Sequence, residues 1–347
     1  MSKPDLEEVF SKLLSADQAF VFFRLPKTKT VHCHFQEDAS LTFTDDLKIN
    51  GFLMSRFDFP LPAVYISNKN HLQFEYEPPF FEPKVQTVSI HSKNRTSFIR
   101  MVNITKKAIA SGRLKKLVVA SKISLNKKID NFKFFSHLLA LYPNAMVYFW
   151  HHPKGETWIG ASPEQLFSVH SGQLITMALA GTLPYNTHEV YDWGDKEKNE
   201  QGWVKEVVQR NLKDFFPSSV LQCSETYTRR AGNLVHLCND LSVEAQNINT
   251  TSLLKKLHPT PAVGGIPVDE GMRFLADHEN LDRAYYTGFF GPVMGEDQID
   301  LFVNLRCAKI ISMGIDLYVG AGITEDSEPE KEWEETLNKS KTLLAAL

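Results

Sequence analysis

Short apolar runs of the kind that form β-strands follow one another along most of this chain, and helix-length segments rarely separate them. Such runs cover residues 116–125, 145–151, 157–161, 165–170, 174–180, 285–291, 299–311 and 315–323. Parallel strands need a crossover of about a dozen residues or more, usually a helix, so this spacing favours antiparallel pairing. The sequence therefore predicts an α+β protein with mostly antiparallel sheets, to which residues 1–95, rich in Phe and Pro, add short strands and loops.

Helices are expected at residues 95–111, 196–215 and 251–257, and a further helix closes the chain. The closing helix begins with a capping-box pattern, Ser327-x-x-Glu330, and has Pro329 in its first turn. Its apolar stripe is formed by Trp333, Leu337 and Leu344.

Charge and composition limit the kinds of partner this chain can take. Lys and Arg number 38 against 41 Asp and Glu, so the net charge of -3 lacks the basic excess typical of nucleic-acid binding. The N-terminal residues are polar, and no apolar run reaches the roughly 18 residues of a membrane helix. The scattered cysteines are expected to be free thiols in a reducing compartment. We expect a cytoplasmic protein with no nucleic-acid, membrane or obligate protein partner.

Two Glu-x-x-Glu pairs are candidate cation ligands, and the first of them is the clearer signal. Glu197 and Glu200 lead directly into Val204, Val207 and Val208, with which they share one stripe of the expected helix. Carboxylates on a buried stripe must be neutralised or compensated. A hard divalent cation such as Mg²⁺, which prefers carboxylate and water oxygens, is the natural compensation.

The second pair, Glu332 and Glu335, has an ordinary alternative. Both residues lie away from the apolar stripe of the closing helix, and Glu335 has Lys339 four residues later. Periodicity alone therefore predicts a solvated face.

Single residues in the strands and loops leave both readings open. Lys116, which leads into a buried strand, either extends to solvent or is a desolvated general base. Glu164 follows a turn as a plain loop residue would, and His236 fits a core histidine. The glycine pairs Gly264-Gly265 and Gly320-x-Gly322 allow close approach of an anion to backbone N–H groups.

Ten segments together resemble the chorismate-utilising enzymes, the family of isochorismate, salicylate, anthranilate and aminodeoxychorismate synthases. They occur in the family's order over residues 95–345: Lys116-Leu-Val-Val-Ala, Gly160-Ala-Ser-Pro-Glu164, Leu179-Ala-Gly-Thr182, Glu197-x-x-Glu200, Val235-His236-Leu, Leu257-His-Pro-Thr-Pro-Ala-Val-Gly-Gly265, Tyr286-Thr-Gly288, Leu305-Arg306, Gly320-Ala-Gly-Ile323 and Glu332-x-x-Glu335-x-x-x-Lys339. The resemblance implies one large domain, residues 1–347, in which two packed sheets are flanked by helices. Residues 1–95 correspond to the family's variable N-terminal part.

The resemblance also implies a Mg²⁺ site and a set of substrate contacts. Glu200 and Glu335 would be metal ligands, with Glu197 and Glu332 in or next to the shell, which overturns the surface interpretation of the second pair. The bound cation would bridge the carboxylates to the ring carboxylate of dianionic chorismate. The residues expected at the substrate are Thr182, His236, Ala262, Tyr286, Arg306, Gly320 and Lys339.

Among the family's reactions, the motifs favour isochorismate synthesis, in which water adds at C2 of the ring and the C4 hydroxyl leaves. Lys116 and Glu164 match the family's base and acid, and ammonia-using members usually lack this lysine. Aminodeoxychorismate synthases often have a lysine where this chain has Ala180, and pyruvate-eliminating members tend to have threonine at Ala262.

A salicylate synthase and a catalytically silent chorismate-binding module stay as alternatives. The product's pathway, menaquinone or siderophore biosynthesis, is left open. Two departures from the family pattern are Ser121, where arginine is usual, and Gln201, where many relatives have histidine.

Overall fold

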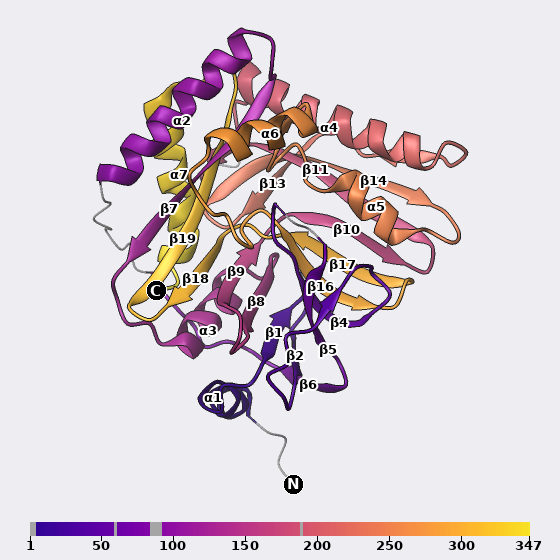
Figure 1. The fold of residues 1–347 in the computed structure, drawn as a ribbon, viewed down its shortest axis with the longest axis vertical. Coiled ribbons are helices and arrows are strands. Elements are labelled where there is room, and N and C mark those ends of the chain that lie inside the picture. Colours follow the sequence, from indigo (N-terminus) through magenta and orange to yellow (C-terminus); the bar gives the residue numbers. More distant parts are fainter. Residues whose placement is uncertain (1–4, 59–60, 84–91, 188–189) are drawn as a thin grey trace.

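Two antiparallel sheets lie face to face in the computed structural model, which describes residues 5–58, 61–83, 92–187 and 190–347 (Figure 1). Sheet A has the strand order β15 (Gly265–Ile266), β7 (Lys116–Leu125), β19 (Gly314–Ile323), β18 (Cys307–Ile311), β9 (Thr157–Ser162), β8 (Met146–His151), β1 (Phe20–Arg24), β2 (Thr30–Phe35) and β6 (Asn70–Glu75). Sheet B has the order β12 (Leu221–Cys223), β14 (Leu234–Glu244), β11 (Gln173–Pro184), β10 (Gln165–His170), β17 (Gln298–Val303), β16 (Phe289–Met294), β4 (Asn50–Met54), β5 (Ala63–Ser67) and β3 (Phe43–Thr44), with β13 (Tyr227–Ala231) paired to β14.

Seven helices cover the outer faces of the described sheets. They are α1 (Leu6–Ser15), α2 (Ser92–Ala110), α3 (Asn131–Leu141), α4 (Asp195–Phe215), α5 (Thr250–Leu257), α6 (Val268–His278) and α7 (Pro329–Leu344). Figure 1 shows α2 and α7 alongside β7 and β19, with α4 and α5 next to β11 and β14. Between the sheets lies an aromatic core that includes Phe23, Tyr148 and Trp158 from sheet A and Phe52 and Phe290 from sheet B. The predicted α+β class with two packed antiparallel sheets is confirmed.

The chain passes between the sheets at two neighbouring points. It leaves β9 at Ser162 to enter β10, and it leaves β17 at Val303 to enter β18. The two passages are hydrogen-bonded to each other, because the Ala161 N–H donates to the Arg306 carbonyl and the Val303 N–H donates to the Glu164 carbonyl, each at 3.0 Å. Glu164 and Arg306 therefore sit side by side at a corner of the sheet pair.

Two predicted strands differ from the structure at turns. The run 299–311 is not one strand, because the chain changes sheets at residues 304–306, where Arg306 has a φ of 50°. The run 285–291 begins too early, since β16 starts at Phe289 and residues 285–288 form a turn in which Thr287 has a φ of 61°.

The helices were predicted with mixed success. Those at α2, α4, α5 and α7 lie where expected, whereas α1, α3 and α6 were not predicted. The capping box is wrong: Glu328 caps α7 without a side-chain hydrogen bond, and the Ser327 hydroxyl instead accepts from the Thr324 N–H at 3.0 Å.

The remaining expectations concern membrane helices, cysteines and domain boundaries. Within the described ranges, no helix is long and apolar enough to cross a membrane. Cys33, Cys223, Cys238 and Cys307 are free thiols, as expected. Residues 1–4, part of the polar N-terminus, lie outside the described residues, and the single-domain boundaries stay a prediction.

We expect Phe10→Ala to lower the free energy of unfolding by about 3 to 5 kcal/mol, the usual cost of deleting a buried aromatic ring. Phe10 of α1 is 1% exposed, and its ring contacts the rings of Phe20, Phe22, Phe132, Phe135 and Phe149. Urea unfolding measures the change, and Phe80→Ala, at a side chain that is 95% exposed, is the control. A loss below about 1 kcal/mol would show that α1 does not stabilise sheet A.

Candidate active site

One cavity brings together most of the residues singled out in the sequence. It is lined by Lys116, Glu164, Thr182, Glu200, His236, Ala262, Tyr286, Arg306, Gly320, Glu335 and Lys339, among others. Of the predicted site residues, only Glu197 and Glu332 are not in its wall. They line a neighbouring cavity between the first turns of α4 and α7, which Glu335 also lines. The two cavities therefore meet at Glu335.

Lys116 is buried and paired, not extended to solvent. Its side chain is 1% exposed, and Nζ lies 2.8 Å from Oε1 of Glu200 on α4. Burial alone would raise the pKa of Glu200, but the charge and hydrogen bond of Lys116, together with the charges of Lys339 and Lys196, outweigh it and the pKa is lowered. The pair needs Gly322 on β19, because a Cβ there would overlap the Glu200 carboxylate and lie 3.0 Å from Cε of Lys116.

The second acidic pair faces the interior, so the surface interpretation from periodicity is wrong. Glu332 is 1% exposed, and Oε1 lies 2.5 Å from Nζ of Lys196 on α4. Burial and the neighbouring Glu335 raise the pKa of Glu332. Helix α7 packs on β19 with its apolar side, and the start of α4 covers the face that periodicity would leave in water.

Lys339 joins this acidic face to the cavity. Its Nζ lies 2.7 Å from Oε1 of Glu335 and donates to the Gly320 carbonyl at 2.9 Å. The i,i+4 contact expected from the sequence is therefore present, but it lies in the cavity wall.

The acidic residues fit an oxygen-liganded cation by their chemistry and charge. Glu197, Glu200, Glu332 and Glu335 supply only carboxylate oxygens, which a hard ion such as Mg²⁺ prefers. Glu200 and Glu335 face the main cavity, and ammonium groups now compensate them. Over the residues that the structure describes, no three acidic, His or Cys side chains converge closely enough to hold a metal without rearrangement.

Glu164 has the properties of a proton donor near neutral pH. It is 4% exposed, and its Oε1 accepts from the Thr260 hydroxyl at 3.4 Å. Burial raises the pKa of its carboxyl to about 7, against the opposing charge of Lys116. A group with such a pKa is poised for acid catalysis.

Arg306 is a buried cation without an acidic partner among the described residues. One nitrogen donates to the Thr342 hydroxyl at 2.8 Å, and the other contacts Nε2 of His236 at 3.4 Å. Nδ1 of His236 lies 2.8 Å from the Gly181 carbonyl, so that nitrogen carries the proton and Nε2 accepts. Burial lowers the pKa of His236 to about 3 and that of Arg306 to about 10.

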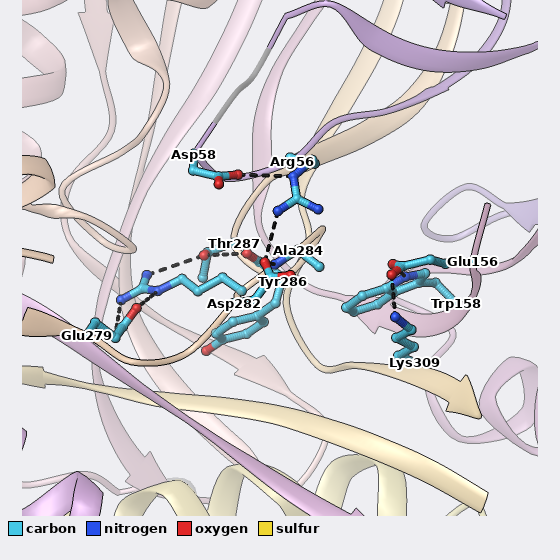
Figure 2. A network of polar contacts seen from close by, with 11 residues as sticks. Arg56, Asp58, Glu156, Trp158, Glu279, Asp282, Ala284, Tyr286, Thr287 and Lys309 are labelled. Atoms are coloured by element: carbon cyan, nitrogen blue, oxygen red, sulfur yellow. Dashed lines mark hydrogen bonds and ion pairs between the residues drawn. The ribbon is translucent and has the colours of Figure 1, made fainter. Parts of the chain in front are cut away.

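The turn that carries Tyr286 is held by a polar network (Figure 2). Arg283 pairs with Glu279, donates to the Thr287 hydroxyl at 3.3 Å, and reaches the Val118 carbonyl of β7 at 2.7 Å. Both partners of the Arg283–Glu279 pair are buried, with exposed fractions of 3% and 6%. In the same network Asp282 accepts from Arg56 at 2.9 Å. The network fixes the Tyr286 side of the cavity to the strand that begins with Lys116.

Comparisons with known proteins identify the family. The family model described as chorismate binding enzyme matches residues 60–347. The chain belongs to this family.

Two curated relatives and one solved structure illustrate the similarity. The isochorismate synthase MenF of Escherichia coli is 29% identical over 273 residues, which are 74% of this chain and 61% of that protein. The salicylate biosynthesis isochorismate synthase of Pseudomonas aeruginosa is 32% identical over 200 residues, 55% of this chain and 42% of that protein. A structure from Bacillus anthracis, provisionally named as a 2,3-dihydroxybenzoate-specific isochorismate synthase, matches with a TM-score of 0.79 and 25% identity, covering 97% of this chain and 98% of the other. The chain thus spans 42% to 61% of these two curated relatives.

The departures from the pattern of this chorismate-binding family lie outside the cavity. Gln201 turns away from it and donates to Asn239, which in turn donates to the Ser224 carbonyl at 2.7 Å. Ser121 lines a separate cavity, in which Lys122 lies 2.9 Å from Asp316.

Sequence reasoning missed some residues that shape this family site. Arg283, which is not in the cavity wall but holds the turn of Tyr286, was not singled out, although a basic residue close to the Tyr286-Thr-Gly288 segment was a usable signal. The wall residue Tyr318 carries no such signal. Gly264 and Gly265 pair with β7 and are not in the wall.

We expect Arg283→Met to lower the free energy of unfolding by about 3 to 5 kcal/mol, because it leaves the Glu279 carboxylate buried without its cation. Arg95→Met is the matched control, since Arg95 pairs with Glu330 on the surface and such pairs contribute about 1 kcal/mol or less. Urea unfolding compares the two variants. Equal losses would contradict a central role for the buried pair.

Proposed function

We propose that this chain is a Mg²⁺-dependent isochorismate synthase, which converts chorismate to isochorismate by adding water at C2 and releasing the C4 hydroxyl. The observation that carries the proposal is the shared cavity of a buried lysine, a buried carboxyl with a pKa of about 7, and an arginine without an acidic partner. The relatives named isochorismate synthase support the same reaction. The net change is an isomerisation, because one hydroxyl is gained and one is lost.

The substrate is a dianion, and its two carboxylates need different partners. Arg306 is the proposed partner of one carboxylate, because a buried guanidinium with only neutral contacts gains most from an anion. Tyr286, Lys339 and the backbone around Gly320 complete this side. His236 and Thr182 lie alongside, and His236 is neutral, so it adds no charge.

The proposed metal ligands are Glu200 and Glu335, with Glu197 and Glu332 next to them. Bound there, Mg²⁺ would supply positive charge for the ring carboxylate, which four glutamates would otherwise repel. Proton removal from water and proton donation to the leaving group are assigned to side chains of this protein.

Lys116 and Glu164 are the proposed base and acid. Lys116 takes a proton from the attacking water, the ring double bonds shift, and Glu164 protonates the departing C4 hydroxyl, which leaves as water. Only a neutral amine can accept a proton, so the base role requires Lys116 to leave its contact with Glu200 and to release a proton to solvent before the water is activated.

A salicylate synthase would use the same residues and also eliminate pyruvate. Ala262, which is half-buried in the cavity wall, has no hydroxyl to offer the enolpyruvyl group, and this favours release of isochorismate. The matches include a solved structure named as a menaquinone-specific isochorismate synthase and a relative named as a vibriobactin-specific one, so the pathway stays open. We still expect the enzyme to be cytoplasmic and to act without an obligate protein partner.

Incubation of the purified protein with chorismate tests the proposal directly. We expect isochorismate in proton NMR spectra, no pyruvate in a coupled lactate dehydrogenase assay, and loss of turnover with EDTA or in Glu335→Gln. Stoichiometric pyruvate would establish the salicylate synthase instead. Binding of chorismate without turnover would favour the silent module, and full activity in EDTA would remove the metal from the proposal.

We expect Glu164→Gln to lower kcat by about 10²- to 10⁴-fold, as for loss of a positioned acid. Because Glu164 must be protonated to act and its pKa is about 7, the ratio of kcat of the unmodified protein to kcat of the variant should fall as the pH rises through about 7. The ratio is used because both proteins share the pH dependence of the base. Glu296→Gln, a half-exposed carboxyl on another loop, is the control. A ratio that stays constant or rises through neutral pH would contradict the acid role.

A further inference from the structure

A second cavity adjoins the active site and has a positively charged wall. It lies between the β13–β14 hairpin, the segment after α3, and the corner where β9 passes into β10. Its wall includes Tyr142, Pro163, Arg229, Arg230, Arg306 and Thr342. Pro163 and Arg306 also line the active-site cavity, so the two cavities adjoin at these residues.

Three arginines contribute to this wall, and the described residues that line it include no carboxylate. Arg229 forms a long ion pair with Asp240, whose Oδ1 lies 3.9 Å from Nη1 and which is about half exposed. Arg230 lies over the Tyr185 ring at 3.6 Å and donates to the Gly232 carbonyl at 3.0 Å. Among the described residues, Arg306 contacts only neutral groups, and Arg230 forms no ion pair. Of the three arginines, only Arg229 is therefore partly compensated by an acidic partner.

Arg229 connects the second cavity to the catalytic groups. It pairs in register with His236 across β13 and β14, so the two side chains share one face of sheet B. After burial, its positive charge is one of the influences on the pKa of both Glu164 and His236. An anion that enters past Arg229 thus comes within reach of Arg306 and of the proposed acid.

The wall of this cavity is well packed. A Cβ on Gly232 would lie 2.6 Å from the Tyr142 ring, so the hairpin turn sits directly against that ring. The Tyr142 hydroxyl donates to the Thr342 carbonyl of α7 at 2.6 Å. The hairpin that carries Arg229 and Arg230 is therefore packed against Tyr142, which is itself hydrogen-bonded to α7.

We propose that this arginine-lined cavity is the entrance through which a small dicarboxylate reaches Arg306, with Arg229 and Arg230 as an anion-attracting rim. The inference rests on the proposed function, because chorismate is the dicarboxylate in question. Positive charge lining a cleft with low-dielectric walls raises the local concentration of anions and their rate of arrival. Such an effect weakens with ionic strength, because salt screens exposed charges.

The test compares Arg229→Gln, Arg230→Gln and the double variant with the unmodified protein in steady-state assays with chorismate. At roughly 20 mM salt we expect kcat/KM of the double variant to fall at least about fivefold, within the range of electrostatic focusing, while kcat changes by less than about twofold. The difference should shrink at roughly 500 mM salt. Arg273→Gln is the control, because it removes the same charge from the exposed surface of α6.

The outcomes separate this inference from the proposed function. If the unmodified protein turns over chorismate and the double variant keeps its kcat/KM at low salt, the entrance is elsewhere and the function stands. A salt-independent loss of kcat would also overturn the inference, since the arginines would then act in the chemical step. If the unmodified protein does not turn over chorismate, the proposed function fails first. Arg230 is exposed, so its variant remains informative even if Arg229→Gln folds poorly.

Discussion

The pairing of buried glutamates with lysines is the interaction on which the rest of the site depends. Moving a charge out of water costs several kcal/mol, so each carboxylate of α4 and α7 needs a cation beside it. The Lys116–Glu200 pair joins β7 to α4 and the Lys196–Glu332 pair joins α4 to α7, whereas Lys339 compensates Glu335 within α7. Gly322 is small for the same reason, since a side chain there would separate Lys116 from Glu200.

The corner between the two sheets supplies the other half of the site. Glu164 and Arg306 lie on two chain passages that are hydrogen-bonded to each other, so a buried acid and a buried cation keep a fixed relation. Both belong to short segments between long ladders and not to surface loops. The chemistry is therefore placed by backbone pairing, which positions groups more accurately than a mobile loop does.

The sequence indicated much of this, and its failures have physical causes. The strands β7 and β10 were predicted with their observed bounds because their apolar runs end at polar residues. The corner at residues 304–306 was missed because a strand that changes sheets keeps its apolar pattern. Periodicity misjudged Glu332, since it assumes one buried helix face, whereas α7 is covered on two. Burial of Lys116 was left open because a lysine's partner, here Glu200 on another element, cannot be read from spacing.

The N-terminal strands have a consequence for how this protein is made. Strand β4 pairs with β16, with Met54 opposite Phe290, and β1 pairs with β8, with Phe20 opposite His151. During synthesis the early strands leave the ribosome long before their partners exist. Until their partners are synthesised, these strands expose apolar faces and unpaired strand edges, and such a chain is prone to associate with other chains. Neither sheet can be completed until most of the chain has been translated, which makes the molecule dependent on late, long-range pairing.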